Sequence, residues 1–283
     1  AYLRLVGSYA LENNTKLEKI VIPAGLGDSS YLCYQLNTCS NLSEIEVDEN
    51  NPYYIQVKEK NVLISTPPYY DPDEYTLVLV AKKATSITIP KEVKRITATA
   101  SLHSKNLQEI IVEDGNVNFY SEDGVLFNYD RTKLIRVPEN SAITNYVIPD
   151  TVEYIEEWAL SRCSNLESVT GGTNVKEIAD DAFYGSAKLK EVNLSSTNLE
   201  IMGDSLFGYC ESLTEITIPE GITSLGRELF YYCENLVKVT IPASVTEISG
   251  RIIQSDQNTT IYTPAGSYAE TYAEEYGIDC VTY

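Results

Sequence analysis

The amino-acid sequence predicts a repeat solenoid, a mostly β stack in which one short strand lies above the next. Three observations predict it: a leucine that recurs at nearly constant spacing, an apolar column seven residues before it, and Ile-Pro or Val-Pro pairs after it. In the C-terminal half the leucines are Leu166, Leu189, Leu213 and Leu236, at intervals of 23, 24 and 23 residues.

Leucines further upstream share this phase, at Leu17, Leu42 and Leu107. A cysteine or serine lies three residues before each leucine from the second repeat on: Cys39, Ser104, Cys163, Ser186, Cys210 and Cys233. The unit is therefore close to L-x-x-I-x-I-P-x-x-V-x-x-I-x-x-x-A-F-x-x-C-x-x-L.

One such unit predicts one short strand whose leucine and isoleucines point inward and whose intervening residues point outward. The proline then turns the chain. A single unit cannot bury its apolar edge, but stacked units form a continuous core, with strands about 4.8 Å apart.

The predicted organisation has three parts: a truncated first repeat over 1–16, a solenoid over 17–257 and a C-terminal cap over 258–283. The start partway through a unit suggests that sequence has been cut away upstream. Two longer modules predict β-hairpins inserted at about 50–85 and 115–140, because strand-like runs there alternate with polar turns.

The last residues break the repeat. Ser267 is a suitable N-cap for a helix over 267–276, Gly277 a suitable end, and residues 278–283 a returning strand. Such an element would cover the open end of the stack.

Composition excludes several classes of function. The formal charge is −20, from 41 acidic and 21 basic residues, so phosphate backbones and anionic lipids are repelled and nucleic-acid binding is not expected. No run of 18 apolar residues exists, so membrane insertion is not expected either. The 22 tyrosines against 5 phenylalanines suit rings that pack while their hydroxyls stay hydrated.

The repeat unit resembles the BspA-like leucine-rich repeat, also described from treponemal surface proteins. The resemblance covers about residues 10–257, and the segments DGVLFNYDRTKLIRVP (123–138) and AGSYAETYAEEYGI (265–278) also look like features of that family. It implies a right-handed, curved leucine-rich-repeat stack on a secreted or surface-anchored protein of a host-associated bacterium. It also implies roles in adhesion, coaggregation and binding of host proteins.

Residues that could carry chemistry are few. A cysteine that recurs every 23 residues indicates core packing rather than catalysis, so buried free thiols are expected, with one disulfide or a metal as alternatives. The single histidine, His103, lacks the third group that a Ser-His dyad needs. The loop 114–118 has Phe119 where an EF-hand needs glycine. The sequence therefore predicts no enzyme, no cofactor and no metal, although paired carboxylates for glycoside cleavage remain an alternative.

The candidate binding residues are the outward side chains of the predicted sheet, which leucine-rich solenoids commonly present to partners as a concave face. They are Lys19, Glu44, Glu46, Glu109, Glu191, Asn193, Glu215, Thr217, Lys238 and Thr240. Their acids suggest a preference for basic protein segments, and Glu44, Glu46 and Glu109 suggest an acidic patch. Simple solvation of a β surface is the alternative. Tyr69, Tyr70 and Tyr75 at an insert tip form a rival site.

These observations predict a non-enzymatic protein-binding or adhesion module that is extracellular or at the cell surface. The expected partner is a host matrix protein or a bacterial surface protein, and the chain is expected to be a monomer. The alternative is a structural spacer that displays another domain, catalytic or not, of a longer secreted protein.

Overall fold

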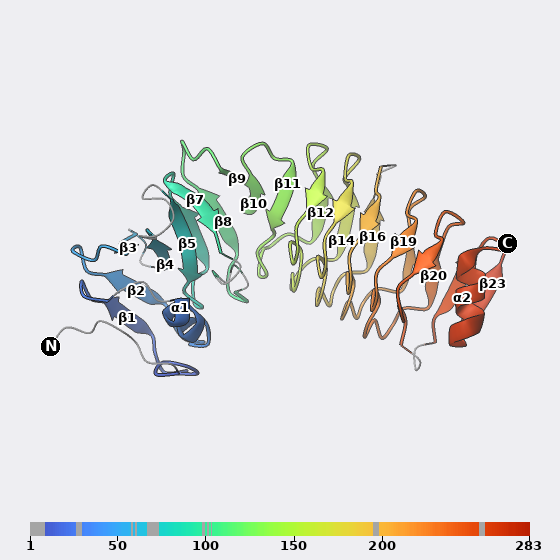
Figure 1. Ribbon diagram of the computed structural model, residues 1–283, viewed down its shortest axis with the longest axis horizontal. Helices are drawn as coiled ribbons and strands as arrows, with labels where there is room; N and C mark the ends of the chain where they lie inside the picture. The colour runs from blue at the N-terminus through green and yellow to red at the C-terminus, as the bar shows by residue number, and fades with distance from the viewer. Residues whose placement is uncertain are drawn as a thin grey trace. The chain divides into compact units, whose positions relative to one another are not determined.

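The computed structural model describes residues 9–26, 30–57, 59, 61–66, 74–97, 100, 102, 104–194, 198–254 and 258–283 (Figure 1). The chain forms two compact units, unit 1 (residues 1–129) and unit 2 (residues 130–283). This division cuts the array predicted over 17–257 in two. Most of the predicted truncated repeat, and His103, lie outside the described residues.

Unit 1 combines parallel strand pairs with inserted hairpins. Its elements are β1 (Lys19–Ile22), α1 (Ser30–Asn37), β2 (Glu44–Val47), β3 (Tyr54–Ile55), β4 (Val62–Ser65), β5 (Tyr75–Val80), β6 (Ser86–Ile89), β7 (Val93–Ile96), β8 (Glu109–Val112), β9 (Phe119–Glu122) and β10 (Val125–Asn128). β1 pairs with β2 and β6 with β8, both in parallel. β3, β4 and β5 are antiparallel, and β9 and β10 form an antiparallel hairpin.

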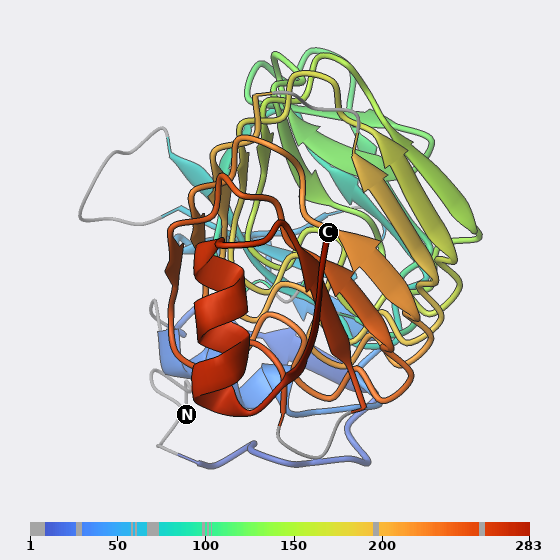
Figure 2. The same ribbon diagram turned by 90° about the vertical axis from the view of Figure 1, so that its right-hand side faces the viewer.

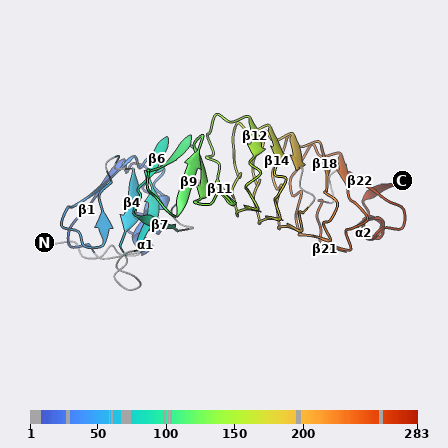
Figure 3. The ribbon, with the colours of Figure 1, turned by 90° about the horizontal axis from the view of Figure 1, so that it is seen from above.

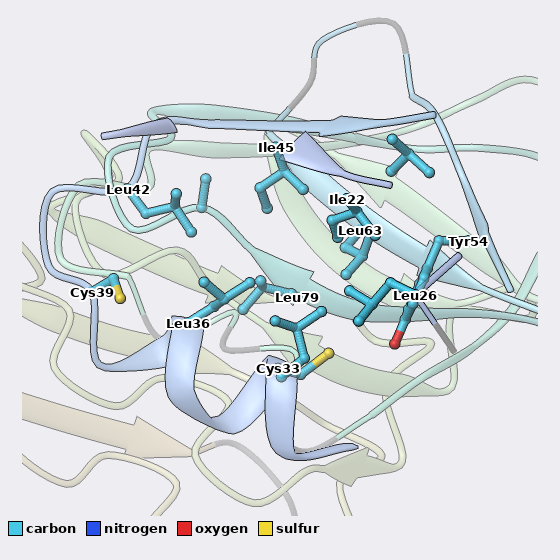
Figure 4. Close-up of a cluster of buried hydrophobic side chains, with 13 residues drawn as sticks. Ile22, Leu26, Cys33, Leu36, Cys39, Leu42, Ile45, Tyr54, Leu63 and Leu79 are labelled. Atoms are coloured by element: carbon cyan, nitrogen blue, oxygen red, sulfur yellow. The ribbon is translucent and has the colours of Figure 1, made fainter. Parts of the chain in front are cut away.

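The helix α1 was not predicted. Leu32, Cys33 and Leu36 are buried, and their spacing gives one apolar face that packs into the core of unit 1 (Figure 4). Gln35 and Leu36 also fit the repeat columns, and this fit conceals the helical period of the segment.

Unit 2 is a regular stack of coils (Figure 1, Figure 3). Its elements are β11 (Lys133–Arg136), β12 (Asn145–Ile148), β13 (Tyr154–Ile155), β14 (Ser168–Gly171), β15 (Glu177–Ile178), β16 (Glu191–Leu194), β17 (Ile201–Met202), β18 (Glu215–Thr217), β19 (Ser224–Leu225), β20 (Lys238–Thr240), β21 (Glu247–Ile248), β22 (Thr260–Thr263), α2 (Tyr268–Tyr276) and β23 (Asp279–Thr282).

Each coil of unit 2 has three sides. The longer strands form parallel sheets in the orders β12-β14-β16 and β18-β20-β22-β23, which we call the long-strand sheets. Short strands form a second side, in the orders β11-β13-β15-β17 and β19-β21. The third side, which we call the turn face, consists of the segments 157–162, 180–185, 204–209 and 227–232.

The repeat columns form the core as predicted. Phe183, Phe207 and Phe230 stack in sequence, with ring centroids 5.2 and 5.7 Å apart and planes within 12° and 7°. The thiols of Cys210 and Cys233 donate to carbonyl oxygens of the preceding coil, over 3.3 and 3.0 Å. The column therefore needs a small buried donor.

Serine meets that need at position 186. Its hydroxyl donates to the carbonyl oxygen of Leu160 over 2.7 Å. Serine and cysteine can therefore alternate in this column without leaving a buried carbonyl unpaired.

The C-terminal helix α2 lies at the end of the stack, as Figure 2 shows along the coils. Its N-cap is Ser267, whose hydroxyl accepts from the backbone N–H of Glu270 over 3.2 Å, and Gly277 ends it with φ 66°. β23 then pairs in parallel with β22. The helix and strand thus cover an apolar end that a further coil would otherwise cover.

Candidate functional site

The long-strand sheets of unit 2 present six of the candidate side chains. Glu191 and Asn193 lie on β16, Glu215 and Thr217 on β18, and Lys238 and Thr240 on β20. The alternate residues between them, such as Ile216 and Val239, are buried. The sequence pattern therefore identified the outward side correctly.

The sequence alignment missed several outward positions in the same columns. β12, β22, β23 and, in unit 1, β6 also present pairs of outward side chains: Asn145 and Val147, Thr260 and Tyr262, Asp279 and Val281, and Ser86 and Thr88. The Ile-Pro pairs at 89–90 and 148–149 were the available signal for two of these strands, because each pair ends such a strand elsewhere.

Two acids of the expected acidic patch, Glu44 and Glu46, lie beside Lys19 in unit 1. Nζ of Lys19 lies 3.4 Å from Oε2 of Glu44 and 3.0 Å from Oε1 of Glu46. These contacts, led by the hydrogen bond to Glu46, raise the pKa of Lys19. Lys19 therefore offsets part of the acidity of this pair.

Glu109, the third acid of that expected patch, lies on β8, which pairs with β6. Gly124 of the β9–β10 hairpin packs directly against it, and a Cβ at that glycine would lie 2.9 Å from Cβ of Glu109. The insert thus borders the sheet of unit 1 at this residue.

The stack of unit 2 is interrupted between two neighbouring coils. β16 is the last strand of one long-strand sheet and β18 the first of the next, and the short strands β17 and β19 are likewise unpaired with each other. The turn face stays connected, because the backbone N–H groups of Ser205, Phe207 and Tyr209 donate to the next coil over 2.9, 2.9 and 2.7 Å. The interval from Leu189 to Leu213, one residue longer than its neighbours, spans this place.

A crevice of about 590 Å³ lies at the interruption. Five of the candidates surround it: Glu191, Asn193, Glu215, Thr217 and Lys238. Leu194, Met202 and Phe207 also line it, so polar side chains surround an apolar interior. This volume is within the range of protein ligand sites, about 300–1,000 Å³.

The charges at the crevice are of both signs. Nζ of Lys238 lies 3.8 Å from Oε2 of Glu215 and 5.1 Å from the centroid of the Tyr262 ring. Nζ of Lys190 is paired with Glu167 over 2.8 Å. Glu191 has no ion-pair partner among the residues that the structure describes, so its carboxylate is available to a ligand.

The rival tyrosine site is only partly visible. Tyr75 begins β5 and is half-buried, whereas Tyr69 and Tyr70 lie outside the described residues.

The cysteines are reduced and mostly buried. All six are in the described part of the chain, none of them forms a disulfide there, and five are buried. Burial raises the pKa of Cys163 and of Cys233 to about 12, so their thiolates are scarce near neutral pH. No group of three or more His, Cys, Asp or Glu side chains within the described ranges could hold a metal ion.

The helices that the structure describes are too short and too polar for any of them to cross a bilayer.

Comparison with known proteins places this architecture in the leucine-rich-repeat class. The profile of the BspA type Leucine rich repeat region matches residues 1–58 and 136–260, in six copies, which is more than half of the chain. The chain therefore belongs to the BspA-type leucine-rich-repeat family. A search of curated protein sequences found no match.

Solved structures agree with the fold. The chain is similar to a leucine-rich repeat protein from Eubacterium ventriosum (TM-score 0.72, 20% identity, 92% of this chain and 70% of that one). It is also similar to a leucine-rich cell surface protein from Faecalibacterium prausnitzii (TM-score 0.69, 25% identity, 94% of this chain and 64% of that one). A third similar structure is that of the pneumococcal vaccine antigen PcpA (TM-score 0.63, 19% identity, 95% of this chain and 68% of that one). At 20% and 19% identity the first and third show the fold alone. The chain thus spans 64% to 70% of the length of these structures.

Proposed function

We propose that this chain is a non-enzymatic protein-binding module of a bacterial cell-surface protein, and that the long-strand sheets of unit 2 contact the partner at the crevice. The observation that carries the proposal is the coincidence of two features. The regular stack is interrupted at one place, and five outward polar side chains surround that place.

Chemistry at the crevice favours a partner segment with basic residues. Glu191 and Glu215 stand on its two sides, on a chain whose formal charge is −20. A lysine or arginine of the partner would meet both carboxylates, while its aliphatic stem would contact the apolar interior. Thr217 and Asn193 would offer hydrogen bonds beside it.

Location at the cell surface is supported by the family and by the Faecalibacterium prausnitzii structure, which is described as a cell surface protein. Binding rather than catalysis is supported by the scarcity of reactive groups in the described residues, where the buried thiols have raised pKa values. Adhesion to a host matrix protein or to another bacterium is the form of binding that we propose.

The test is a binding screen with a matched pair of variants. The immobilised chain is exposed to a panel of extracellular-matrix proteins and to intact bacterial cells. Any interaction that appears is measured again with Glu191→Gln/Glu215→Gln. We expect the dissociation constant of a specific partner to rise about tenfold or more, because two charge contacts in a partly dry site are lost.

The control variant is Glu177→Gln/Glu247→Gln, which removes two charges from the short-strand side of the same unit. It should leave binding unchanged. Equal loss in both variants would mean that only the net charge matters, and no binding across the panel would favour a spacer role instead.

A further inference from the structure

Five aromatic side chains form a continuous strip across the turn face of unit 2. They are Trp158, Tyr184, Tyr209, Tyr231 and Tyr232, from four consecutive coils. Ring centroids lie 5.5 Å apart for Trp158 and Tyr184, and 5.2 Å apart for Tyr184 and Tyr209. Tyr209 continues to Tyr232 over 4.8 Å, and Tyr231 lies edge-on to Tyr232 at 4.4 Å. We call these residues the aromatic strip.

Glycine makes the strip possible. The ring of Tyr184 lies over Gly208, where a Cβ would be 2.8 Å from Cδ2 of the ring. Phe207 precedes that glycine and Tyr209 follows it, so the absence of a side chain at 208 lets Tyr184 reach the next ring. The corresponding positions of the neighbouring coils are Ser161, Tyr184 and Tyr231.

Two of the tyrosines occupy unfavourable backbone conformations. Tyr209 and Tyr232 have φ of 59° and 53°, in the left-handed region, where a bulky residue is strained. Gly185, with φ 73°, holds the same place in the coil before them and avoids that cost. Arg162, with φ 53°, holds the equivalent place one coil earlier, so the left-handed conformation belongs to the turn itself and recurs from coil to coil.

Carboxylate side chains lie in the same turns as the rings of the aromatic strip. Asp181 lies three residues before Tyr184 and Glu228 three before Tyr231, each in the same tight turn, and Nε1 of Trp158 donates to Glu157 over 2.7 Å. The carboxylates of Asp180, Glu157, Asp204 and Glu228 are near enough to influence Asp181. Burial first, and these acids second, raise the pKa of Asp181 to about 6.

Basic side chains balance only part of the negative charge of these carboxylates. Five acids of the turn face lie close to one another (Glu157, Asp180, Asp181, Asp204 and Glu228), and two basic residues of the same segments, Arg162 and Arg227, lie near Tyr184 and Asp204. Nε of Arg227 is already paired with Asp204 over 2.7 Å. The strip is therefore an aromatic surface in a negative potential.

We propose that the aromatic strip and the carboxylates beside it form a second binding surface of unit 2, which takes an extended, arginine-rich segment of a partner protein. Guanidinium groups stack on tyrosine and tryptophan rings and pair with carboxylates, so this surface offers both interactions at once. The chain already uses the first of them internally, because Arg251 lies over the Tyr276 ring at 5.3 Å.

The length of the strip sets the size of the segment. Three steps between coils at about 4.8 Å give about 14 Å, the length of roughly four extended residues. Two arginines at alternate positions of such a segment would both lie on the strip.

This surface is separate from the crevice, because it lies on another side of the same coils. The proposal goes beyond the crevice function and does not depend on it. Variants of each surface can therefore be tested against the same probe.

The probe is a synthetic nine-residue peptide with arginine at alternate positions and glycine between them, labelled for fluorescence anisotropy. Its matched control has glutamine in place of arginine. Trp158 is the single tryptophan of the chain, so its emission reports binding at one end of the strip directly. We expect the arginine peptide to bind and to change that emission, and the glutamine peptide to bind about tenfold more weakly or not at all.

The strip variant is Tyr232→Ser/Asp181→Asn/Glu228→Gln, and it should weaken binding of the arginine peptide about tenfold. The control variant is Tyr268→Ser/Asp279→Asn/Glu247→Gln, which makes the same chemical changes at exposed residues elsewhere in unit 2. Circular dichroism confirms that both are folded. Unchanged affinity in the strip variant would overturn the proposal, as would equal binding of the two peptides.

Loss of peptide binding in Glu191→Gln/Glu215→Gln, with the strip variant unaffected, would also overturn it. That result would assign the basic segment to the crevice instead.

Discussion

Nη2 of Arg136 lies 3.5 Å from Oε1 of Glu139, and only 2% and 7% of the two side chains are exposed. Nη1 of the same guanidinium donates to the carbonyl oxygen of Trp158 and, over 3.2 Å, to the hydroxyl of Ser161. Burial lowers the pKa of Arg136 to about 10, and at this pKa the guanidinium is still charged at neutral pH. The buried cation thus ties β11 to the turn face of the next coil.

Removal of Glu139 should destabilise unit 2 strongly. Glu139→Ala leaves a charged guanidinium without its carboxylate in the core, and we expect the free energy of unfolding to fall by about 3 kcal/mol. Urea titration followed by Trp158 emission measures it. The exposed pair Lys176–Glu153, 2.6 Å apart, is the control, and Glu153→Ala should cost less than about 1 kcal/mol.

Protonation of Asp181 should stabilise the protein as the pH falls. Its folded pKa of about 6 lies above the usual value of 3.8, so the folded state binds more protons than the unfolded state between about pH 4 and 6. Stability from this group is therefore fully present below pH 4 and is lost as pH rises through 6. Asp181→Asn should raise the melting temperature at pH 7.5 and leave it almost unchanged at pH 4.

The choice of asparagine in that test avoids a confounding strain, because Asp181 has φ 56° and asparagine tolerates the left-handed region. Asp279→Asn, at an exposed carboxylate in β23, serves as the comparison. A similar gain at pH 7.5 from that change would show that net charge, and not the surroundings of Asp181, sets the effect.

Native thiols should react unevenly. Burial raises the pKa values of Cys39, Cys163, Cys210, Cys233 and also Cys280, but Cys280 is only half-buried whereas the other five cysteines are buried. Alkylation with iodoacetamide at pH 8, followed by mass spectrometry, should modify Cys280 first and the rest only after denaturation. Early modification of Cys233 would contradict its assignment to the core.

A methyl group at position 208 should disturb the strip. Gly208→Ala places Cβ 2.8 Å from the Tyr184 ring, and we expect a loss of about 1–2 kcal/mol together with weaker peptide binding. The double variant Tyr184→Ala/Gly208→Ala supplies the control, since the added methyl then meets no ring. A double-mutant cycle with no coupling between the two positions would show that the contact has no energetic weight.

The coils and the outward-facing columns could be predicted from the sequence, because both depend on the local alternation of apolar and polar residues and on a leucine at fixed spacing. Glu191, Glu215 and Lys238 could be placed on one side of the sheet in this way. The crevice between them could not be predicted, since the one extra residue after Leu189 could equally have been absorbed by a turn. The aromatic strip was also missed, because Trp158 and Tyr184 occupy different repeat columns and meet only diagonally.

The interruption between β16 and β18 also determines how firmly the two neighbouring coils are held together. Two sides of the neighbouring coils share no strand pairing there, while the turn face keeps three backbone hydrogen bonds and the stacked rings of Phe207 and Phe230. The backbone N–H of Ser212 also donates to the carbonyl oxygen of Ala187 across the same boundary, over 3.0 Å. The two coils are therefore held together along the turn face and the corner beside it but not along their sheets, so we expect them to separate more readily at the crevice than at the other coil boundaries of unit 2.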